Sequence, residues 1–270
     1  MIIDLLRHGA AFVSYTDGGS VAARHSPRPF LTATTSRGIP VTDVSPADHR
    51  HHLGMSATAP DVGGTSFWGG RTFVRDVGST MLDNHGTQRV LERAQSGGVC
   101  TERVSWEDRA GDALLHEERT IATEASGDTV SITWISRLTA VRDDVTFGTP
   151  QTNGRPGAFY GGLFWRTPFP SASVRTADGE GIDTAHGSRS PWLAVDGPHA
   201  SLVAVTSNDM PWFVRSEGYV GFGPSIAATE RRLLPRGQTL ELHLAVAVLD
   251  EVPADPGAIA GELMSATQAR

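Results

Sequence analysis

The run from Thr239 to Leu249 has a large aliphatic residue at every second position, from Leu240 to Val248. In an extended chain these side chains share one face, while Glu241 and His243 share the other. A strand of about ten residues with a fully apolar face suits a large sandwich of two antiparallel sheets. The run therefore predicts an all-β fold built around this strand.

Shorter runs of the same kind agree with this prediction. Residues 129–134 alternate, and Ile135 then breaks the phase, which indicates a β-bulge. Further strands are expected at residues 114–123, 201–206 and 212–214. The alternating strand–helix series of Rossmann folds and TIM barrels is absent. Turn sequences separate the strands: Ser126-Gly127-Asp128, Ala177-Asp178-Gly179, Asp196-Gly197-Pro198 and Pro235-Arg236-Gly237.

Only residues 256–268 are predicted to form a helix. Pro256 stands at its start, and Ile259, Leu263 and Met264 share one side. Glycine and proline are spread evenly along the 270 residues, without a linker or an internal repeat. We therefore expect one β-sandwich domain over residues 1–270, with the C-terminal helix at an edge or an end of it.

Charge and composition narrow the classes of function. All 23 basic residues are arginine, against 30 acidic residues and a net charge of −7. An acidic chain without a basic stripe argues against nucleic acid, and the lack of lysine excludes Schiff-base and P-loop lysines. With Cys100 as the single cysteine, no disulfide or cysteine–zinc site forms within the chain. No apolar run reaches the roughly 20 residues of a membrane span and no secretory signal is recognisable, so we expect a soluble cytoplasmic protein without a membrane partner.

The segment Asp48-His49-Arg50-His51-His52-Leu53-Gly54 holds the densest chemistry of the chain. If it is extended, His49 and His51 share one face and His52 lies on the other. Jelly-roll enzymes use such an H-x-H pair to hold a divalent metal, with a carboxylate and a third histidine from elsewhere. No acid follows the pair here, so three interpretations stay open: a metal site, a polar pocket without metal, and a structural turn. The remaining ligands of a metal site would come from Glu117, Glu118, His85 and His116.

Other polar groups are candidates for the same site. On a strand, His116 and Glu118 share a face and form a serviceable acid–base pair, although an exposed face with cross-strand ion pairs explains them equally well. His85 lies in the sequence Asn84-His85-Gly86, which is also typical of an ordinary turn. Tryptophan offers a flat apolar face to a sugar, while arginine and asparagine donate to its hydroxyls. Such residues late in the chain are Arg189, Trp192, Asn208, Trp212 and Arg215.

Four blocks of sequence lie at residues 28–31 (RPFL), 38–43 (GIPVTD), 46–56 (PADHRHHLGMS) and 62–69 (VGGTSFWG). Together they resemble the PmoA-like family, a bacterial domain of unknown function often labelled methane oxygenase PmoA. Shorter blocks at 118–120, 147–149, 211–215 and 221–222 are similar to later parts of the family pattern, so the resemblance covers most of the chain. His51, His52 and Gly54 match the pattern, whereas Arg50 stands where the family usually carries an aromatic residue.

The resemblance implies carbohydrate catabolism and not methane oxidation, because members are commonly found beside sugar-processing genes and this chain has no membrane span. It also implies a mutarotase-like supersandwich. We therefore expect a protein that binds a small carbohydrate and acts on it as an epimerase, lyase or hydrolase. The alternatives are a non-catalytic carbohydrate-binding or accessory subunit and an H-x-H divalent-metal enzyme.

The expected site residues fall into three groups. His51, His52 and Glu118 are expected to be catalytic, and His49 and His51 are the candidate ligands if a divalent metal is bound. The expected substrate-binding residues are His49, His85, Arg119, Arg189, Trp192, Asn208, Trp212 and Arg215.

Overall fold

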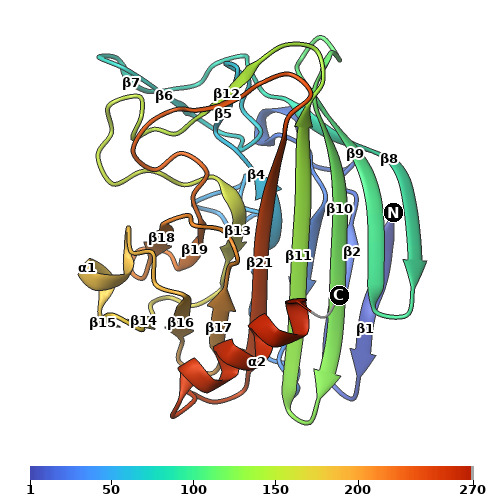
Figure 1. Ribbon diagram of the computed structural model, residues 1–270, viewed down its shortest axis with the longest axis vertical. Coiled ribbons are helices and arrows are strands. Elements are labelled where there is room, and N and C mark those ends of the chain that lie inside the picture. The colour runs from blue at the N-terminus through green and yellow to red at the C-terminus, as the bar shows by residue number, and fades with distance from the viewer. Residues whose placement is uncertain (269–270) are drawn as a thin grey trace.

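Two large antiparallel sheets face each other in the computed structural model, which describes residues 1–268 (Figure 1). The larger sheet has nine strands, in the spatial order β15 (Gly179–Glu180), β14 (Ser173–Thr176), β16 (Trp192–Asp196), β17 (Ser201–Val205), β21 (Thr239–Leu249), β11 (Thr129–Ala140), β10 (Ala113–Ser126), β9 (Val99–Glu107) and β8 (Thr87–Ser96). The smaller sheet has seven, in the order β1 (Ile2–His8), β2 (Ala11–Thr16), β3 (Phe30–Ala33), β4 (Met55–Thr58), β13 (Gly162–Arg166), β19 (Gly221–Pro224) and β18 (Trp212–Arg215).

Smaller elements complete the chain. A three-stranded sheet has the order β20 (Arg232–Leu234), β12 (Val145–Gly148) and β5 (Asp61–Val62), and β6 (Thr72–Val74) pairs with β7 (Gly78–Thr80). The helical segments are η1 (Ala23–His25), α1 (Ile182–Ala185) and α2 (Pro256–Gln268). None of the helices within residues 1–268 has the length and apolar character that crossing a bilayer requires.

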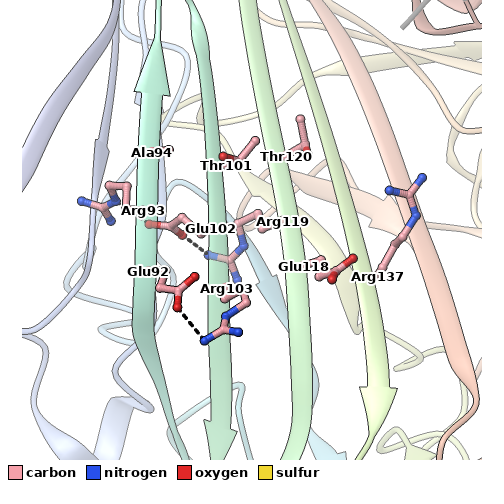
Figure 2. Close-up of a pocket in the computed structure, with 10 residues that line it drawn as sticks. All are labelled: Glu92, Arg93, Ala94, Thr101, Glu102, Arg103, Glu118, Arg119, Thr120 and Arg137. Carbon is pink, nitrogen blue, oxygen red and sulfur yellow. Dashed lines mark hydrogen bonds and ion pairs between the residues drawn. The ribbon is translucent and has the colours of Figure 1, made fainter.

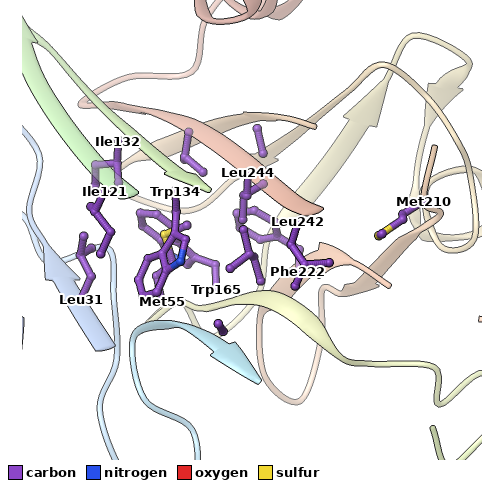
Figure 3. Close-up of a cluster of buried hydrophobic side chains, with 14 of the residues drawn as sticks. Leu31, Met55, Ile121, Ile132, Trp134, Trp165, Met210, Phe222, Leu242 and Leu244 are labelled. Atoms are coloured by element: carbon purple, nitrogen blue, oxygen red, sulfur yellow. The ribbon is translucent and has the colours of Figure 1, made fainter. Parts of the chain in front are cut away.

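A continuous apolar core fills the space between the two large sheets (Figure 3). Trp134 of β11 and Leu244 of β21 enter it from the nine-stranded sheet, and Met55 of β4, Trp165 of β13 and Phe222 of β19 enter it from the other. The rings of Trp165 and Phe222 stack with centroids 6.1 Å apart. Because fully burying a large apolar side chain contributes about 1.5–3 kcal/mol, this core is the main source of stability.

The strand β21 has a second covered face. Its outward residues Ala245 and Ala247 are small, and α2 packs on them through Ala260 and Leu263 (Figure 1). Small outward side chains let the helix approach the sheet closely. The helix therefore covers part of the outer face of the nine-stranded sheet.

A buried ion network crosses the core beside the apolar cluster. The Nε and Nη2 atoms of Arg119 donate to the Glu117 carboxylate at 2.7 Å each, and Nη1 donates to the Tyr15 hydroxyl at 2.6 Å. The Tyr15 hydroxyl donates to Glu102 at 2.6 Å, and the indole of Trp106 donates to Glu117 at 2.7 Å. The network ties β2 of the smaller sheet to β9 and β10 of the larger one.

The predicted β-sandwich with a C-terminal helix is confirmed, and β21 and α2 begin and end at the predicted residues. The β-bulge predicted at Ile135 is wrong. The strand β11 pairs with β10 and with β21 without any register shift. Ile135 keeps the strand alternation and lies half-buried on the outer face, where a β-branched residue suits the pleated surface.

Candidate functional site

Strand alternation in the seven-stranded sheet turns a second set of aromatic side chains away from the main core. On β13, Trp165 faces the core and Phe164 faces outward, and on β18 Phe213 also faces outward. Trp68 and Phe159 pack on these two rings from neighbouring loops. We call these four outward rings (Trp68, Phe159, Phe164 and Phe213) the aromatic floor.

A pocket of about 420 Å³ adjoins the aromatic floor, and we call it the histidine pocket. Five stretches of chain contribute to its lining, within residues 47–52, 68–71, 79–81, 155–160 and 213–219, together with His25. The strands β13 and β18 hold the floor, and loops form the wall. The pocket thus lies on the outer side of the smaller sheet.

The histidine-rich segment reaches this pocket as a turn and not as a strand. The backbone N–H of His49 donates to the carbonyl of Pro46 at 3.1 Å, and that of His52 donates to the carbonyl of His49 at 2.9 Å. Because the chain turns, His49, His51 and His52 all line the same pocket. The strand alternation that would have paired His49 with His51 and excluded His52 does not apply.

The three imidazoles touch one another and the surrounding rings. His49 and His52 stack with centroids 4.5 Å apart, and His51 meets His52 edge-on at 4.8 Å. The ring of Tyr219 lies 4.9 Å from His49, and that of Trp68 lies 5.4 Å from His52. The aromatic floor therefore fixes the deepest histidine, and that histidine supports the other two.

Asp48 orients His49. Its Oδ2 lies 2.7 Å from Nδ1 of His49, and the hydrogen bond from His49 holds the pKa of Asp48 below its ordinary value. A carboxylate can only accept, so Nδ1 carries a proton, and in the neutral ring Nε2 keeps its lone pair. The guanidinium of Arg166 lies 3.6 Å from the same carboxylate. Asp48 is therefore held as an anion that presents His49 as a proton acceptor.

His51 and His52 are neutral imidazoles. Burial, followed by the charge of Arg28, lowers the pKa of His51 to about 3, and burial lowers the pKa of His52 well below its ordinary value. Near neutral pH both rings therefore offer one donor and one acceptor without a charge. The Nδ1 atom of His52 is buried and has no hydrogen-bond partner within the described residues.

Two features hold His51 in place. Nη2 of the buried Arg28 donates to the backbone carbonyl of His51 at 2.8 Å. Gly70, at φ +73°, leaves room for the ring, since a Cβ there would lie 2.8 Å from Nδ1 of His51. Gly70 is required both for its left-handed backbone and for this close approach.

Two tyrosines add hydroxyls to the pocket. Tyr160 packs against Trp68 with centroids 4.3 Å apart, and Tyr219 lies against His49 and His52. Burial raises the pKa of Tyr160 to about 12 and raises the pKa of Tyr219 as well. Both phenols therefore stay protonated and remain hydrogen-bond donors at neutral pH.

Glu118 and Arg119 lie outside the histidine pocket because they belong to β10 of the other sheet. Glu118 is exposed on the outer face of that sheet, directly opposite Arg137 of β11 and Arg103 of β9 (Figure 2). Arg119 points the other way, into the buried ion network. The shallow hollow of about 550 Å³ around Glu118 is lined by charges that largely pair with one another, as in Arg103 with Glu92.

The remaining predicted residues divide into two groups. Arg215 lines the histidine pocket, and His85 borders a neighbouring hollow that shares Met81 with it. Four others make structural contacts away from the pocket: Arg189 pairs with Asp209, Trp192 packs beside α2, Asn208 accepts from the backbone of His243, and the buried Trp212 donates to the carbonyl of Ser190.

The metal interpretation depended on His49 and His51 sharing a strand face. The turn removes that arrangement, and Glu118 and His116 lie on β10, in the opposite sheet. Within residues 1–268 no group of three or more histidine, cysteine, aspartate or glutamate side chains is arranged to hold a metal ion.

Several lining residues were not anticipated from the sequence. Tyr160, Tyr219, Arg71 and Arg155 each come from a loop that carries no motif. His25 lies with its ring stacked 6.5 Å from that of His51. The only available signal was their chemical type, because nothing local in the sequence tells which distant loops meet.

Comparison with known protein families gives one match that covers nearly the whole chain. A family model described as "Family of unknown function (DUF6807)" matches residues 3–263. No curated protein matches the chain.

Solved structures give distant similarities. A candidate aldose 1-epimerase from Escherichia coli K12 has a TM-score of 0.47 and 12% identity, over 92% of this chain and 98% of its own. A galactose mutarotase-related enzyme from Lactobacillus acidophilus has a TM-score of 0.43 and 9% identity, over 94% of this chain and 100% of its own. A polysaccharide lyase has a TM-score of 0.42 and 12% identity, over 95% of this chain but 35% of its own. At these scores the likeness is remote, and no activity follows from it.

Proposed function

Because the chain belongs to the DUF6807 family of unknown function, we propose its activity from the site itself: it binds a sugar or modified glycoside in the histidine pocket and moves a proton on it through His49. The observation that carries the proposal is the hydrogen bond between Asp48 and His49, formed in the lining of a pocket that neutral imidazoles and phenols also line. An imidazole whose Nδ1 is held by a carboxylate is a well-known general base.

The composition of the lining favours a sugar over a purely apolar ligand. Tyr160 and Tyr219 offer ring faces for the C–H side of a pyranose, and their hydroxyls and the neutral rings of His51 and His52 offer donors and acceptors for its hydroxyl groups. The volume of about 420 Å³ lies within the usual range of small-molecule pockets, which is about 300–1,000 Å³. A monosaccharide or a short glycoside fits this description.

His49 is the better general base of the three histidines. The side chain of His49 is 34% exposed, so a ligand reaches it, whereas His52 is 2% exposed and stacked behind it. His51 has a pKa of about 3 and is a weak base. We therefore assign the proton transfer to His49, the positioning role to Asp48, and hydroxyl recognition to His51 and His52.

The same proton transfer serves an epimerase, a lyase or a hydrolase of bacterial sugar catabolism, and the proposal covers these three classes. The PmoA-like resemblance of the histidine block supports the sugar assignment and stays a prediction. A non-catalytic carbohydrate-binding subunit is the second candidate. It is favoured by one observation: Asp48 is the single carboxylate in the pocket lining, and it is already engaged by His49 and Arg166.

The test is a sugar panel screened by ligand-observed NMR and calorimetry, followed by product analysis for any sugar that binds. We expect Asp48→Asn and His49→Gln to abolish turnover while sugar binding falls only a few-fold. Glu118→Gln and His116→Gln are the matched controls, because both side chains are exposed on β10 in the opposite sheet. Turnover unaffected by His49→Gln would refute the catalytic role, and binding without turnover in the wild type would favour the binding subunit.

A further inference from the structure

The histidine pocket carries a strong excess of positive charge. Four arginines line it, Arg50, Arg71, Arg155 and Arg215, against the single carboxylate of Asp48. This imbalance runs against the charge of the protein as a whole, which has a net charge of −7. When a cleft carries charge of one sign, its electrostatic field is focused inside the cleft and attracts ligands of the opposite charge.

Within residues 1–268 none of these four arginines has a carboxylate within ion-pair distance. Arg50, Arg71 and Arg215 donate instead to the backbone carbonyls of Ser45, Ser79 and Gly157. Carbonyl partners fix the direction of a guanidinium without cancelling its charge. These three arginines are therefore held in place, and their charges are not paired with a carboxylate.

Most arginines elsewhere in the described chain pair with a carboxylate, although some, such as Arg28 and Arg75, do not. Arg137 pairs with Glu241 at 2.9 Å and Arg142 pairs with Asp112 at 2.8 Å, both on exposed surface. The high arginine content of the chain therefore does not by itself explain why the pocket arginines lack carboxylate partners.

A buried cation directly behind the pocket is a second, independent observation. Arg28 is 1% exposed, and its donors go to Ser56 Oγ and to backbone carbonyls, including those of His51 and Trp68. No carboxylate pairs with it within the described chain. Burial lowers its pKa to about 9, so it still carries its charge at neutral pH. An uncompensated buried charge is costly, and an anion bound in the adjacent pocket would offset part of that cost.

The positive charge of the arginines also affects the pKa values of the titratable groups around the pocket. After burial, the charges of Arg24, His85, Arg28 and Arg50 lower the pKa of His25. Arg155 and Arg215 likewise oppose the rise in the pKa of Tyr160 and Tyr219 that burial causes. These two arginines therefore act on the part of the pocket where the tyrosines lie.

We infer that the ligand of the histidine pocket is an anion: a monosaccharide-sized sugar that carries a carboxylate, a sulfate ester or a phosphate ester. This inference rests on the proposed function for the sugar and on the arginines for the charge. Arg215 is the principal anion contact, because it is half-buried, stacked 4.8 Å over the ring of Phe213 and anchored to the carbonyl of Gly157. Arg155, whose guanidinium has no hydrogen-bond partner among residues 1–268, completes the anion site.

The experiment measures binding to the full chain by calorimetry with six probes: D-glucose, D-glucuronate, D-glucose 6-sulfate, D-glucose 6-phosphate, acetate and inorganic phosphate. We expect at least one of the three charged sugars to bind about tenfold or more tightly than glucose, as a charge-assisted hydrogen bond to arginine contributes. Which of the three binds best identifies the anion. Its affinity should fall as salt rises, because part of the pocket is open to solvent.

Variants localise the effect. Arg215→Gln and Arg155→Gln should each weaken the charged sugar about tenfold and change glucose binding less than about twofold. Arg142→Gln, an exposed arginine outside the pocket lining, is the matched control and should change neither. Loss of glucose and charged-sugar binding in equal measure would contradict the anion role of Arg215.

The outcomes separate the two proposals. Equal affinity for glucose and all charged sugars overturns the anion inference and leaves the sugar function standing. Binding of acetate or phosphate as tight as that of the charged sugars supports the anion site and overturns the sugar function. Absence of binding to all six probes overturns both.

Discussion

His49 and His52 stack with ring centroids 4.5 Å apart and planes 19° from parallel, so a buried neutral imidazole forms the back wall of the proposed base. Asp48 holds the other side of His49 through Nδ1. The orientation of His49 is thus fixed by one hydrogen bond and one ring contact.

This stack predicts different effects for two substitutions of His52. His52→Ala should lower the unfolding free energy by about 2–4 kcal/mol, because it leaves a cavity against Trp68 and Phe164, and it should weaken sugar binding by releasing His49. His52→Phe should keep binding within a few-fold of the wild type, because a ring of similar shape preserves the stack. Denaturant unfolding and calorimetry measure both. Equal loss of binding in the two variants would mean that the imidazole nitrogens of His52, and not its ring, are what matters.

Stability should fall as the solution becomes more acidic. The folded pKa of His51 is about 3 and its ordinary value is 6.5, so below about pH 6.5 the unfolded chain takes up a proton that the folded chain refuses. Each such group lowers the unfolding free energy by up to about 1.4 kcal/mol per pH unit until the pH approaches the folded pKa. Urea unfolding at a series of pH values measures the slope.

The contribution of His51 is isolated by difference. His51→Asn should flatten the acid slope, whereas His116→Asn, which alters an exposed residue, should leave it unchanged. Identical slopes in wild type and His51→Asn would show that His51 is protonated in the folded state.

Gly70→Ala should abolish ligand binding while the protein stays folded. The new Cβ would lie 2.8 Å from Nδ1 of His51 and push the ring out of place. Gly237→Ala is the matched control, because Gly237 has almost the same φ, +75°, with nothing within 4 Å of the added Cβ. Both variants should lose about 1 kcal/mol of stability from backbone strain. Only Gly70→Ala should lose binding, and retained affinity there would contradict the described position of His51.

Arg119→Leu should be severely destabilising. It would leave Glu117 buried without its cation, whereas Glu102 keeps its ion pair with Arg93, and removing one partner of a buried pair costs about 3–5 kcal/mol. Arg137→Leu removes an arginine from an exposed pair with Glu241 and should cost less than about 1 kcal/mol. Chemical denaturation compares them, and similar losses would mean that solvent reaches the network.

Trp192→Ala should loosen the C-terminal helix without affecting the ligand. Trp192 packs with Ile259, Leu263 and Met264 beside the outer face of the nine-stranded sheet, away from the histidine pocket. We expect faster hydrogen exchange across residues 256–268 together with unchanged sugar affinity. A loss of affinity would restore Trp192 as a binding residue.

The spacing of apolar residues is enough to predict the main elements of the fold. The strand β21 and the helix α2 follow directly from residue spacing, because an apolar face must find a partner. The bulge predicted at Ile135 is wrong because, in the sequence, an isolated apolar residue on the outer face of a strand cannot be told from a shift in the strand alternation. Sheet order and the pairing of β13 with β4 depend on long-range contacts, and no local pattern encodes them.

The sequence predicts which segment contributes to the candidate site, but not which other residues line it. The density of histidines marked residues 48–54, and that segment does line a pocket. A turn at this segment is one of the three interpretations left open by the sequence, but the convergence of all three rings on one pocket is not predicted, because strand alternation separates His52 from the other two. Glu118 was grouped with the histidines by chemical type alone. Its strand belongs to the other sheet, which only the tertiary structure reveals.

The strand β13 acts as a partition between two environments. Trp165 packs in the core between the large sheets, while its neighbour Phe164 packs in the aromatic floor beside the histidine pocket. Phe164 and Phe213 are buried in the aromatic floor, but changes in the loops above them leave the packing between the large sheets untouched. Substitutions in these loops are therefore expected to change ligand preference with little risk to folding, and related chains are expected to vary most there.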